Sequence, residues 1–538
     1  MWNISTKFKK NNILIRLFYI VLAFLPAGFA WINSVRHWVN STDTAKGIIA
    51  LTAVMLLIMI WRYIRKDEIN VKSEIITVVF FTIIAFWLRI IVVEVLNTYP
   101  VSDPGNAYWN AQRIALGNSI PHSMKGYYAQ HTHWGTWVMV LSAVMRVFGA
   151  TLDVARTFTV LLSTLNIPLY YYAAKIICKN SKIAIIAMML ITISPGMICY
   201  SGVLVNDHMT DLFVVLYFIF LALGYQKRQE NNLKKAILYY VFAALSLGGF
   251  ECFKLVALIL LLATAIGEFV INIVPGFGVF LKERNIVDFL KRIAVSFVIL
   301  LMLFLGQKGV LSASYVIYEK VLDLEIYKAA EDSLWSNLYM GLNLEYNGTY
   351  AGELALMRNT MRENYPDPEQ RNEIYKEMLF DSLDGNGKAL MDLFVEKFGV
   401  AWGDEVYSGE QTFIAGSMKY NTKAAEDVQN KYKTGHNFIA PVLKYVAAGF
   451  WAVVTFGALL GAIVSIKKKT NYSFLISMIY LFGFTLLMEL MLVQGRYKEI
   501  VYFPLIMLAS YGYYEVITML YNKMVHLIKK EKMDEVIE

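Results

Sequence analysis

Residues 74–109 read EIITVVFFTIIAFWLRIIVVEVLNTYPVSDPGNAYW. The apolar part, from Ile75 to Leu96, holds only two charged residues and is long enough to cross a bilayer as a helix. It ends in a polar segment that contains Asp103. Apolar runs of similar length recur along the chain, so this stretch predicts a membrane protein whose charged residues lie between its spans.

The composition of the whole chain agrees with this prediction. Of its 538 residues, 57% are hydrophobic and 17% are charged, and the mean hydropathy is +0.47. Such a balance excludes an ordinary soluble domain. The net charge of +8 comes from small basic groups between apolar runs, which indicates topology and excludes a nucleic-acid surface. Cys178, Cys199 and Cys252 are widely spaced, which favours buried thiols over a disulfide framework or a zinc site.

The apolar runs predict an all-α polytopic membrane protein with about 12 transmembrane helices. The predicted spans are residues 14–34, 48–62, 75–97, 157–177, 183–201, 211–226, 236–250, 255–274, 292–307, 441–465, 472–492 and 500–522. Residues 134–149 are apolar but short and carry Arg146, which suits either a span or a re-entrant or juxtamembrane helix. If this piece does not cross, every basic cluster falls on the cytoplasmic side, so we predict that it does not.

The predicted spans also divide the chain into parts. Residues 1–74 are two additional N-terminal helices, 75–307 a catalytic core with a first extracytoplasmic loop at 98–133, 308–440 an extracytoplasmic domain, 441–522 the C-terminal helices, and 523–538 a tail. Residues 308–440 are polar, and helices are predicted within them at 354–364 and 369–383. Both termini are expected in the cytoplasm and the site on the opposite side of the cell membrane.

Polar residues follow several spans and share the extracytoplasmic face in this topology. Asp103 lies just after a span, where partial burial makes a carboxylate more basic and suits it to accept a proton from a hydroxyl. Its Asp-Pro-Gly sequence is also typical of a turn. Asp207 and Asp211 are four residues apart, which suits acid/base work or cation binding, with a helix cap by Asn206 or Asp207 as the alternative.

Histidines and cations gather near the same face. His131 and His133 suit a divalent metal shared with a carboxylate, hydrogen bonds to a phosphate, or an interfacial aromatic belt. Glu251 and Lys254 lie between two apolar runs, where ionisable residues indicate a site or an internal ion pair. Arg496 has a planar guanidinium group that can bind two phosphate oxygens at once. The alternative is that its side chain only extends to the membrane interface.

The order of these motifs resembles the C-type glycosyltransferases. The relevant features are Asp103 followed by Tyr108, an aromatic and histidine segment that enters a short helix ending at Gly149, Asn206-Asp207, Lys254 after a glycine-rich helix end, and Gln494 to Tyr497. The chain is most similar to the branch of protein O-mannosyltransferases and aminoarabinose transferases, which is like glycosyltransferase family 39, in its Gram-positive bacterial form. It departs from this family at Pro104, because a second acidic residue often follows the first there.

The resemblance implies an integral-membrane glycosyltransferase. Such an enzyme transfers a sugar from a polyprenyl-phosphate donor to an extracytoplasmic glycan, teichoic acid, lipid or protein, usually with inversion. The residue roles that it implies are Asp103 as catalytic base, Asp207 as a supporting carboxylate, Lys254, Arg496 and Tyr497 at the donor phosphate, and Tyr108, His131, His133 and Glu251 as acceptor-binding or auxiliary residues. No cofactor is required, although a divalent metal stays open, and membrane lipids are the other expected partners.

Two other functions are compatible with many spans and a charged site. A transporter or flippase of lipid-linked saccharides usually has two repeated halves with interrupted helices, and the sequence shows no such symmetry. A non-catalytic assembly protein of the cell envelope would tolerate replacement of Asp103.

Overall fold

The computed structural model describes residues 13–65, 70–96, 100, 102–324, 334–349, 351–403, 440–467 and 471–537. Helices dominate these ranges and no strand occurs in them, which confirms the predicted all-α polytopic class. Ten helices of the described part are long and apolar enough to cross a membrane. They are α2 (Asp43–Arg65), α3 (Val71–Leu96), α7 (Leu152–Cys178), α10 (Asp207–Gln229), α11 (Leu233–Phe253), the continuous run of α12 (Ala257–Glu268), η1 (Phe269–Ile273) and α13 (Val274–Glu283), α14 (Ile286–Leu322), α20 (Ala440–Lys467), α21 (Tyr472–Leu490), and η5 (Gly495–Val501) continued by α22 (Tyr502–Ile537).

Two further predicted spans take another form. Residues 14–34 lie in α1 (Ile13–Val39), and residues 183–201 are divided between α8 (Ser181–Thr192) and α9 (Pro195–Tyr200). The division has a local cause, because Pro195 has no N–H to continue the helix and the Ser194 hydroxyl accepts from the Met197 N–H at 3.3 Å. The predicted count of about 12 spans is therefore reached when α1 and the broken pair α8–α9 cross as well.

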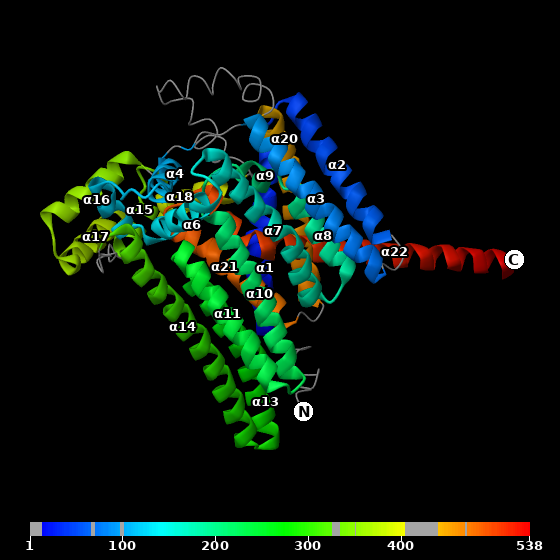
Figure 1. Cartoon of the computed structure of the whole chain (residues 1–538). Helices are drawn as coiled ribbons and strands as arrows, with labels where there is room; N and C mark the ends of the chain where they lie inside the picture. Colours follow the sequence, from blue (N-terminus) through cyan, green and yellow to red (C-terminus); the bar gives the residue numbers. More distant parts are fainter. Residues whose placement is uncertain are drawn as a thin grey trace.

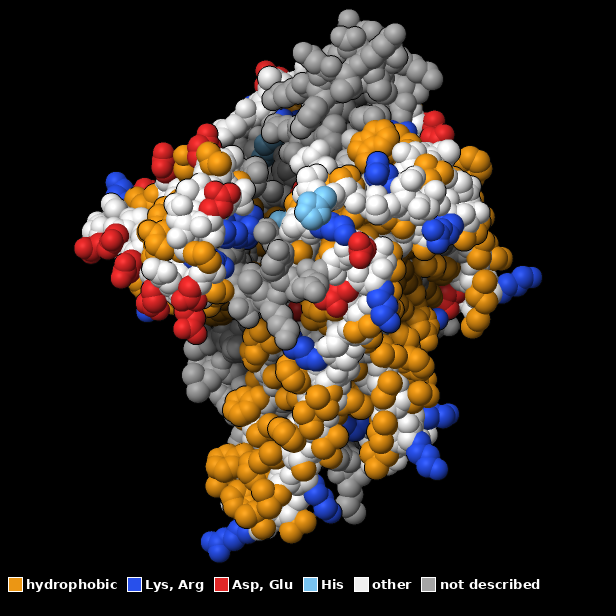
Figure 2. Space-filling view, turned by 60° about the vertical axis from the view of Figure 1, so that its left-hand side comes forward, with side chains coloured by type: hydrophobic (Ala, Val, Ile, Leu, Met, Phe, Trp, Pro, Cys, Tyr) orange, Lys and Arg blue, Asp and Glu red, His pale blue; other side chains and the backbone are white. Residues whose placement is uncertain are grey.

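The surface of the spans has the character of a lipid-facing surface. Phe80, Ile83 and Trp87 of α3 each expose more than half of their side chain. Figure 2 shows hydrophobic side chains over the lower part of one face, with Lys and Arg at its lower tip. In a bilayer such a face is covered by acyl chains, while the helices satisfy their own backbone groups.

A polar lobe of four helices lies at one end of the bundle (Figure 1). It consists of α15 (Leu334–Gly341), α16 (Gly352–Asn364), α17 (Pro368–Leu383) and α18 (Gly387–Trp402), which confirms the helices predicted at 354–364 and 369–383. The helix α14 has 37 residues, about 55 Å, and continues through the predicted domain boundary at residue 308. Residues 404–439 of the predicted domain lie outside the described residues.

Three shorter helices, α4 (Ser102–Ala115), α5 (His122–Gln130) and α6 (Thr132–Phe148), lie at the same end (Figure 1). The Tyr318 ring near the end of α14 packs against Gly135 at the start of α6, and its hydroxyl donates to the Tyr128 carbonyl of α5 at 2.5 Å. The end of α6 adjoins α4, since Arg146 donates to the Ile114 carbonyl at 3.3 Å. With 17 residues, α6 is also not among the ten helices of the described part that could cross a membrane, which agrees with the predicted juxtamembrane helix.

Lys397 fastens the polar lobe to the bundle. Its ammonium group is buried and donates to the carbonyls of Gly341 at 2.6 Å and Met491 at 2.8 Å, and also to the carbonyl of Glu489. A second contact lies beside it, where the Val493 N–H donates to the Gly348 carbonyl at 3.0 Å. These bonds join α18 and the 341–348 turn to the end of α21.

We predict that Lys397→Met loosens this lobe. The substitution leaves three buried carbonyl groups without their donor, and hydrogen bonds to a charged group contribute about 1.5–3 kcal/mol each. We expect a loss of about 3 kcal/mol or more in stability, seen as a lower unfolding temperature in detergent and faster proteolysis between residues 334 and 403. Lys388→Met, at an exposed position of the same helix, is the control. Equal proteolysis rates for both variants would contradict the anchoring role.

Candidate active site

A cavity of about 850 Å³ lies where the polar lobe, the α4–α6 layer and the ends of α10, α11 and α21 meet. Most of the residues predicted for the site line it, although they come from segments far apart in the sequence. The predicted residues in its wall are Asp103, His131, His133, Asp207, Lys254, Arg496 and Tyr497. Tyr108 and Glu251 are not among its lining residues.

Asp103 presents a carboxylate to this cavity from the first turn of α4. The segment is more than an Asp-Pro-Gly turn, because a helix begins at Ser102 and Gly105 packs so closely on Pro100 that a Cβ would lie 2.9 Å from its carbonyl oxygen. Oδ1 of Asp103 accepts a hydrogen bond from the Tyr127 hydroxyl at 2.7 Å. Burial and the neighbouring carboxylate raise the pKa of Tyr127, so its phenol stays protonated and keeps Asp103 in position.

Two cations share one aromatic ring in the cavity wall. The Lys254 ammonium lies 5.0 Å and the Arg496 guanidinium carbon 5.7 Å from the centre of the Tyr497 ring. Arg496 also donates through Nε to the Gln494 side chain at 3.0 Å, which orients the planar group. Lys254 forms an ion pair with Asp207, whose side chain is 1% exposed. A fixed pair of cations beside a cavity is suited to an anion with several oxygens.

The position of Lys254 depends on a break between two spans. The helix α11 ends at Phe253 and α12 begins at Ala257, and Lys254 between them has an extended backbone. Oε2 of Glu251 accepts from the Ala257 N–H at 2.8 Å and so satisfies one donor at the start of α12. Glu251 therefore neither lines the cavity nor pairs with Lys254, and its observed role is to stabilise the break that turns Lys254 toward the site.

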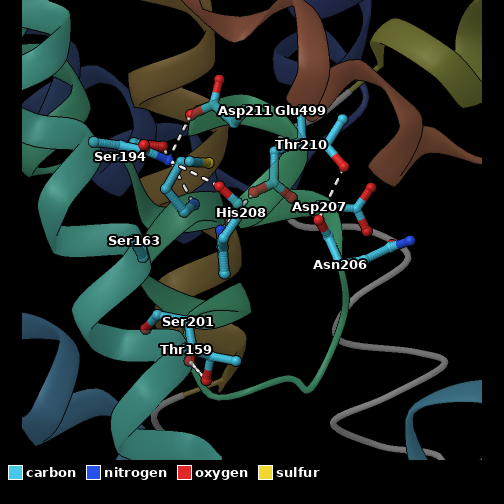
Figure 3. A network of polar contacts seen from close by, with 12 residues as sticks. Thr159, Ser163, Ser194, Ser201, Asn206, Asp207, His208, Thr210, Asp211 and Glu499 are labelled. Atoms are coloured by element: carbon cyan, nitrogen blue, oxygen red, sulfur yellow. Dashed lines mark hydrogen bonds and ion pairs between the residues drawn. The ribbon is translucent and has the colours of Figure 1, made fainter. Parts of the chain in front are cut away.

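The carboxylates of Asp207 and Asp211 serve different neighbours, although they are one helical turn apart. Figure 3 shows the two side chains directed away from each other. Asp211 accepts from Asn166 at 3.0 Å and from the Tyr170 hydroxyl at 2.9 Å, within the bundle. In the same network His208 Nδ1 lies 2.6 Å from an oxygen of Glu499, which joins α10 to η5. This buried network holds α7, α10 and η5 together, but its residues do not line the cavity.

Asn206 does not act as a helix cap. It stands at the start of α10 but makes no capping hydrogen bond, and its side-chain amide donates to the Phe253 carbonyl at 2.6 Å. This bond ties the start of α10 to the end of α11, so it holds the segments of Asp207 and Lys254 together.

His131 and His133 line the cavity with ring centres 6.0 Å apart. Burial, with nearby cations, lowers the pKa of His131 to about 4 and that of His133 to about 3, so both rings are neutral at pH 7. Among the described residues, no three His, Cys, Asp or Glu side chains come together as a metal-ligand group, so His131, His133 and Asp103 do not form one. Each neutral ring retains one N–H donor.

Tyr108 lies in the core of the α4–α6 layer. It is 5% exposed, and its hydroxyl accepts from the Gln112 side chain at 3.2 Å. The family resemblance implied an auxiliary role for Tyr108, but five residues along a helix from Asp103 turn its side chain to another face.

Sequence reasoning missed the contribution of the polar lobe. Asn337 of α15 and Arg358 and Asn359 of α16 complete the cavity wall. Nothing in the sequence around these residues indicated a site, because their proximity depends on the docking of the lobe. Gln494 and Tyr127 lie within the motifs described above. Their hydrogen bonds, from Arg496 to Gln494 and from Tyr127 to Asp103, depend on the tertiary structure and could not be read from the sequence.

A comparison of the sequence with models of protein families identifies one match. Residues 136–316, about a third of the chain, match the family PMT, described as dolichyl-phosphate-mannose-protein mannosyltransferase. This match confirms the resemblance seen in the motifs and includes Asp207 and Lys254, while Asp103 and Arg496 lie outside it. No curated protein matched the chain. The helical membrane fold and the family match together support a membrane glycosyltransferase that uses polyprenyl-phosphate-sugar donors.

The low histidine pKa values predict acid-sensitive stability. An unfolded histidine has a pKa near 6.5, so below that pH the unfolded chain binds protons that the folded site accepts only near pH 4 and below. Stability therefore falls as the pH falls from 6.5 to about 4. We expect the double variant His131→Gln/His133→Gln to lose roughly 3–4 kcal/mol less stability than the wild type between pH 7 and pH 5.

Unfolding temperatures in detergent at pH 7, 6 and 5 measure this difference. His122→Gln replaces an exposed histidine of the same layer and serves as the control, with the wild-type pH dependence. If the double variant is as acid-sensitive as this control, the two rings are not buried in their neutral form.

Proposed function

We propose that this membrane protein is an inverting glycosyltransferase with Asp103 as its catalytic base. The observation that carries the proposal is the meeting of the Asp103 carboxylate with the cation pair Lys254 and Arg496 in one cavity. The donor is a polyprenyl-phosphate sugar, whose phosphate binds at the two cations and whose chain lies among apolar residues. Leu255, Phe484, Leu487 and Met488 supply such an apolar part of the wall.

The proposed reaction follows from the charges in the cavity. The acceptor hydroxyl oxygen attacks the anomeric carbon, and its proton passes to Asp103. The bond between that carbon and the phosphate oxygen breaks, and its electron pair stays on the phosphate. Lys254 and Arg496 stabilise the added negative charge, so no strong general acid is needed.

Asp103 and Asp207 take different roles in this scheme. Asp207 is buried and paired with Lys254, so it holds a phosphate-binding cation in place. Asp103 is half-buried, and within the described residues it takes part in no ion pair. A carboxylate outside an ion pair is the better proton acceptor, and one base is sufficient for inversion.

We propose that the cavity opens on the extracytoplasmic side. The connections α10–α11 and α13–α14 carry Lys227, Lys234, Lys282 and Lys291, and they lie at the ends of these helices remote from Lys254. The positive-inside rule assigns that remote end to the cytoplasm. Both termini are then cytoplasmic, and acceptors meet the site outside the cell membrane.

Replacement of the base tests the chemistry. With purified protein in liposomes and a panel of radiolabelled polyprenyl-phosphate sugars and envelope acceptors, we expect Asp103→Asn to lower kcat by about 10²–10⁴-fold, the usual contribution of a general base. Donor affinity should change little, because the phosphate binds elsewhere. Lys254→Gln should instead weaken donor binding.

Asp153→Asn, at the start of α7 and away from the cavity wall, is the matched control. Transfer by Asp103→Asn at the rate of this control would exclude Asp103 as base. Movement of labelled donor across the bilayer without any transfer would support a transporter instead.

Metal removal tests the role of the cation pair. Because two side-chain cations face the leaving phosphate in this proposal, we expect EDTA to leave the transfer rate within about twofold of the untreated rate. Loss of activity that returns on addition of Mg²⁺ or Mn²⁺ would show that a metal shares this role.

A further inference from the structure

Four aromatic rings follow one another along the cavity beside Asp103. Tyr127, His131, His133 and Trp134 come from the junction of α5 and α6, and all four line the cavity. The ring centres are 4.7 Å apart for the first pair, 6.0 Å for the second and 6.2 Å for the third. We call these four residues the aromatic wall. The reaction proposed above gives a task only to Tyr127, so the other three rings need another explanation.

The aromatic wall extends from the base to the phosphate-binding cations. At one end, the Tyr127 hydroxyl donates to Asp103 at 2.7 Å. At the other end, burial lowers the pKa of His133, and the nearby charges of Lys254 and Arg496 lower it further. In the proposed reaction the transferred sugar lies between the donor phosphate and the base. The aromatic wall therefore lies along the space that this sugar must occupy.

The rings of the aromatic wall suit a sugar in their chemistry. A pyranose has C–H groups on its faces, and their slightly positive hydrogens are attracted to the negative face of an aromatic ring. Around its edge it has hydroxyl groups, each of which is both a donor and an acceptor. His131 and His133 are neutral at pH 7, so each ring likewise offers one donor and one acceptor.

The surroundings of His133 indicate which of its nitrogens carries the proton. Nδ1 is buried and has no hydrogen-bond partner among the described residues. A buried N–H without an acceptor is rarer than a buried acceptor without a donor, so the proton belongs on Nε2. A hydroxyl oxygen accepts a hydrogen bond from this N–H. An ammonium group has three donors and no acceptor, so it cannot.

The charges around the cavity also oppose an ammonium group on the sugar. Among the described residues that line the cavity are three basic side chains and two carboxylates. One of these carboxylates, Asp207, is paired with Lys254. An ammonium group on the sugar would therefore have to pair with Asp103, and it would then occupy the base that the reaction needs.

We propose that the aromatic wall is the subsite for the transferred sugar and that His133 is its specificity-determining residue. Nε2 of His133 donates to one sugar hydroxyl, while a C–H face of the sugar lies against the neighbouring rings. The subsite thereby selects a pyranose with a hydroxyl group over an amino sugar with an ammonium group at the same position. This inference rests on the proposed transferase function.

A set of donor analogues tests the subsite. Full-length protein in nanodiscs is titrated with labelled polyprenyl-phosphate glucose, mannose and galactose. The sugar that binds best is then compared with analogues in which one hydroxyl at a time is replaced by an ammonium group. We expect one position to stand out, where the replacement weakens binding about tenfold more than at the other positions, because a hydrogen bond is lost there.

Variants assign this position to His133. In His133→Leu the penalty at that position should fall to the value at the other positions, because no N–H remains to be lost. His133→Gln keeps an N–H donor and should retain most of the difference. Each ratio is measured within one variant, so a general loss of affinity cancels. His122→Gln, at an exposed position of the same layer, should show the wild-type pattern.

Three results would overturn the subsite. They are equal penalties at all positions in the wild type, the same outstanding position in His133→Leu, or tighter binding of an amino analogue than of its parent sugar. If sugar is transferred in any of these cases, the glycosyltransferase function stands and only the sugar subsite fails. If the preference depends on His133 but no donor is ever cleaved, the proposed function fails and the sugar-binding site remains.

Discussion

The site depends on the ion pair between Lys254 and Asp207 at the end of the membrane bundle. A charged side chain at this depth is costly unless it is paired and hydrogen-bonded, so the two residues must stay together for either to be tolerated. The pair joins the start of α10 to the end of α11, and the bond from Asn206 to the Phe253 carbonyl reinforces the same junction. The Tyr497 ring then adds Arg496 of the η5 segment to the cluster.

Other elements of the fold complete what this cluster begins. The α4–α6 layer carries Asp103 and the two histidines to the cavity without crossing the bundle. The polar lobe closes the remaining side, and its buried anchor Lys397 fixes α15 and α18 against the end of α21. The cavity is thus built by three units that are distant in sequence, and each one contributes a different chemical group.

The sequence predicted the membrane architecture well because a membrane-spanning helix must be both long and apolar. These two requirements are easy to recognise in a sequence. It also indicated Asp103, Asp207, Lys254 and Arg496, since ionisable residues at the ends of spans are few and conspicuous. It did not show that Glu251 supports a helix start, that α14 continues well past the predicted boundary, or that Tyr108 turns away from the cavity. Those outcomes follow from local hydrogen bonds and side-chain direction. The sequence did not indicate Arg358, because the position of this residue in the cavity wall depends only on how the polar lobe docks on the bundle.

The most direct test of the account is a structure of the full-length protein in nanodiscs with a phosphonate analogue of a polyprenyl-phosphate sugar. We predict phosphonate oxygens within hydrogen-bonding distance of Lys254 and Arg496, and a sugar whose anomeric carbon faces the space beside Asp103. A phosphonate bound away from these two cations, with the cavity taken up by another group, would contradict the central claim that one cavity unites the donor phosphate with the base.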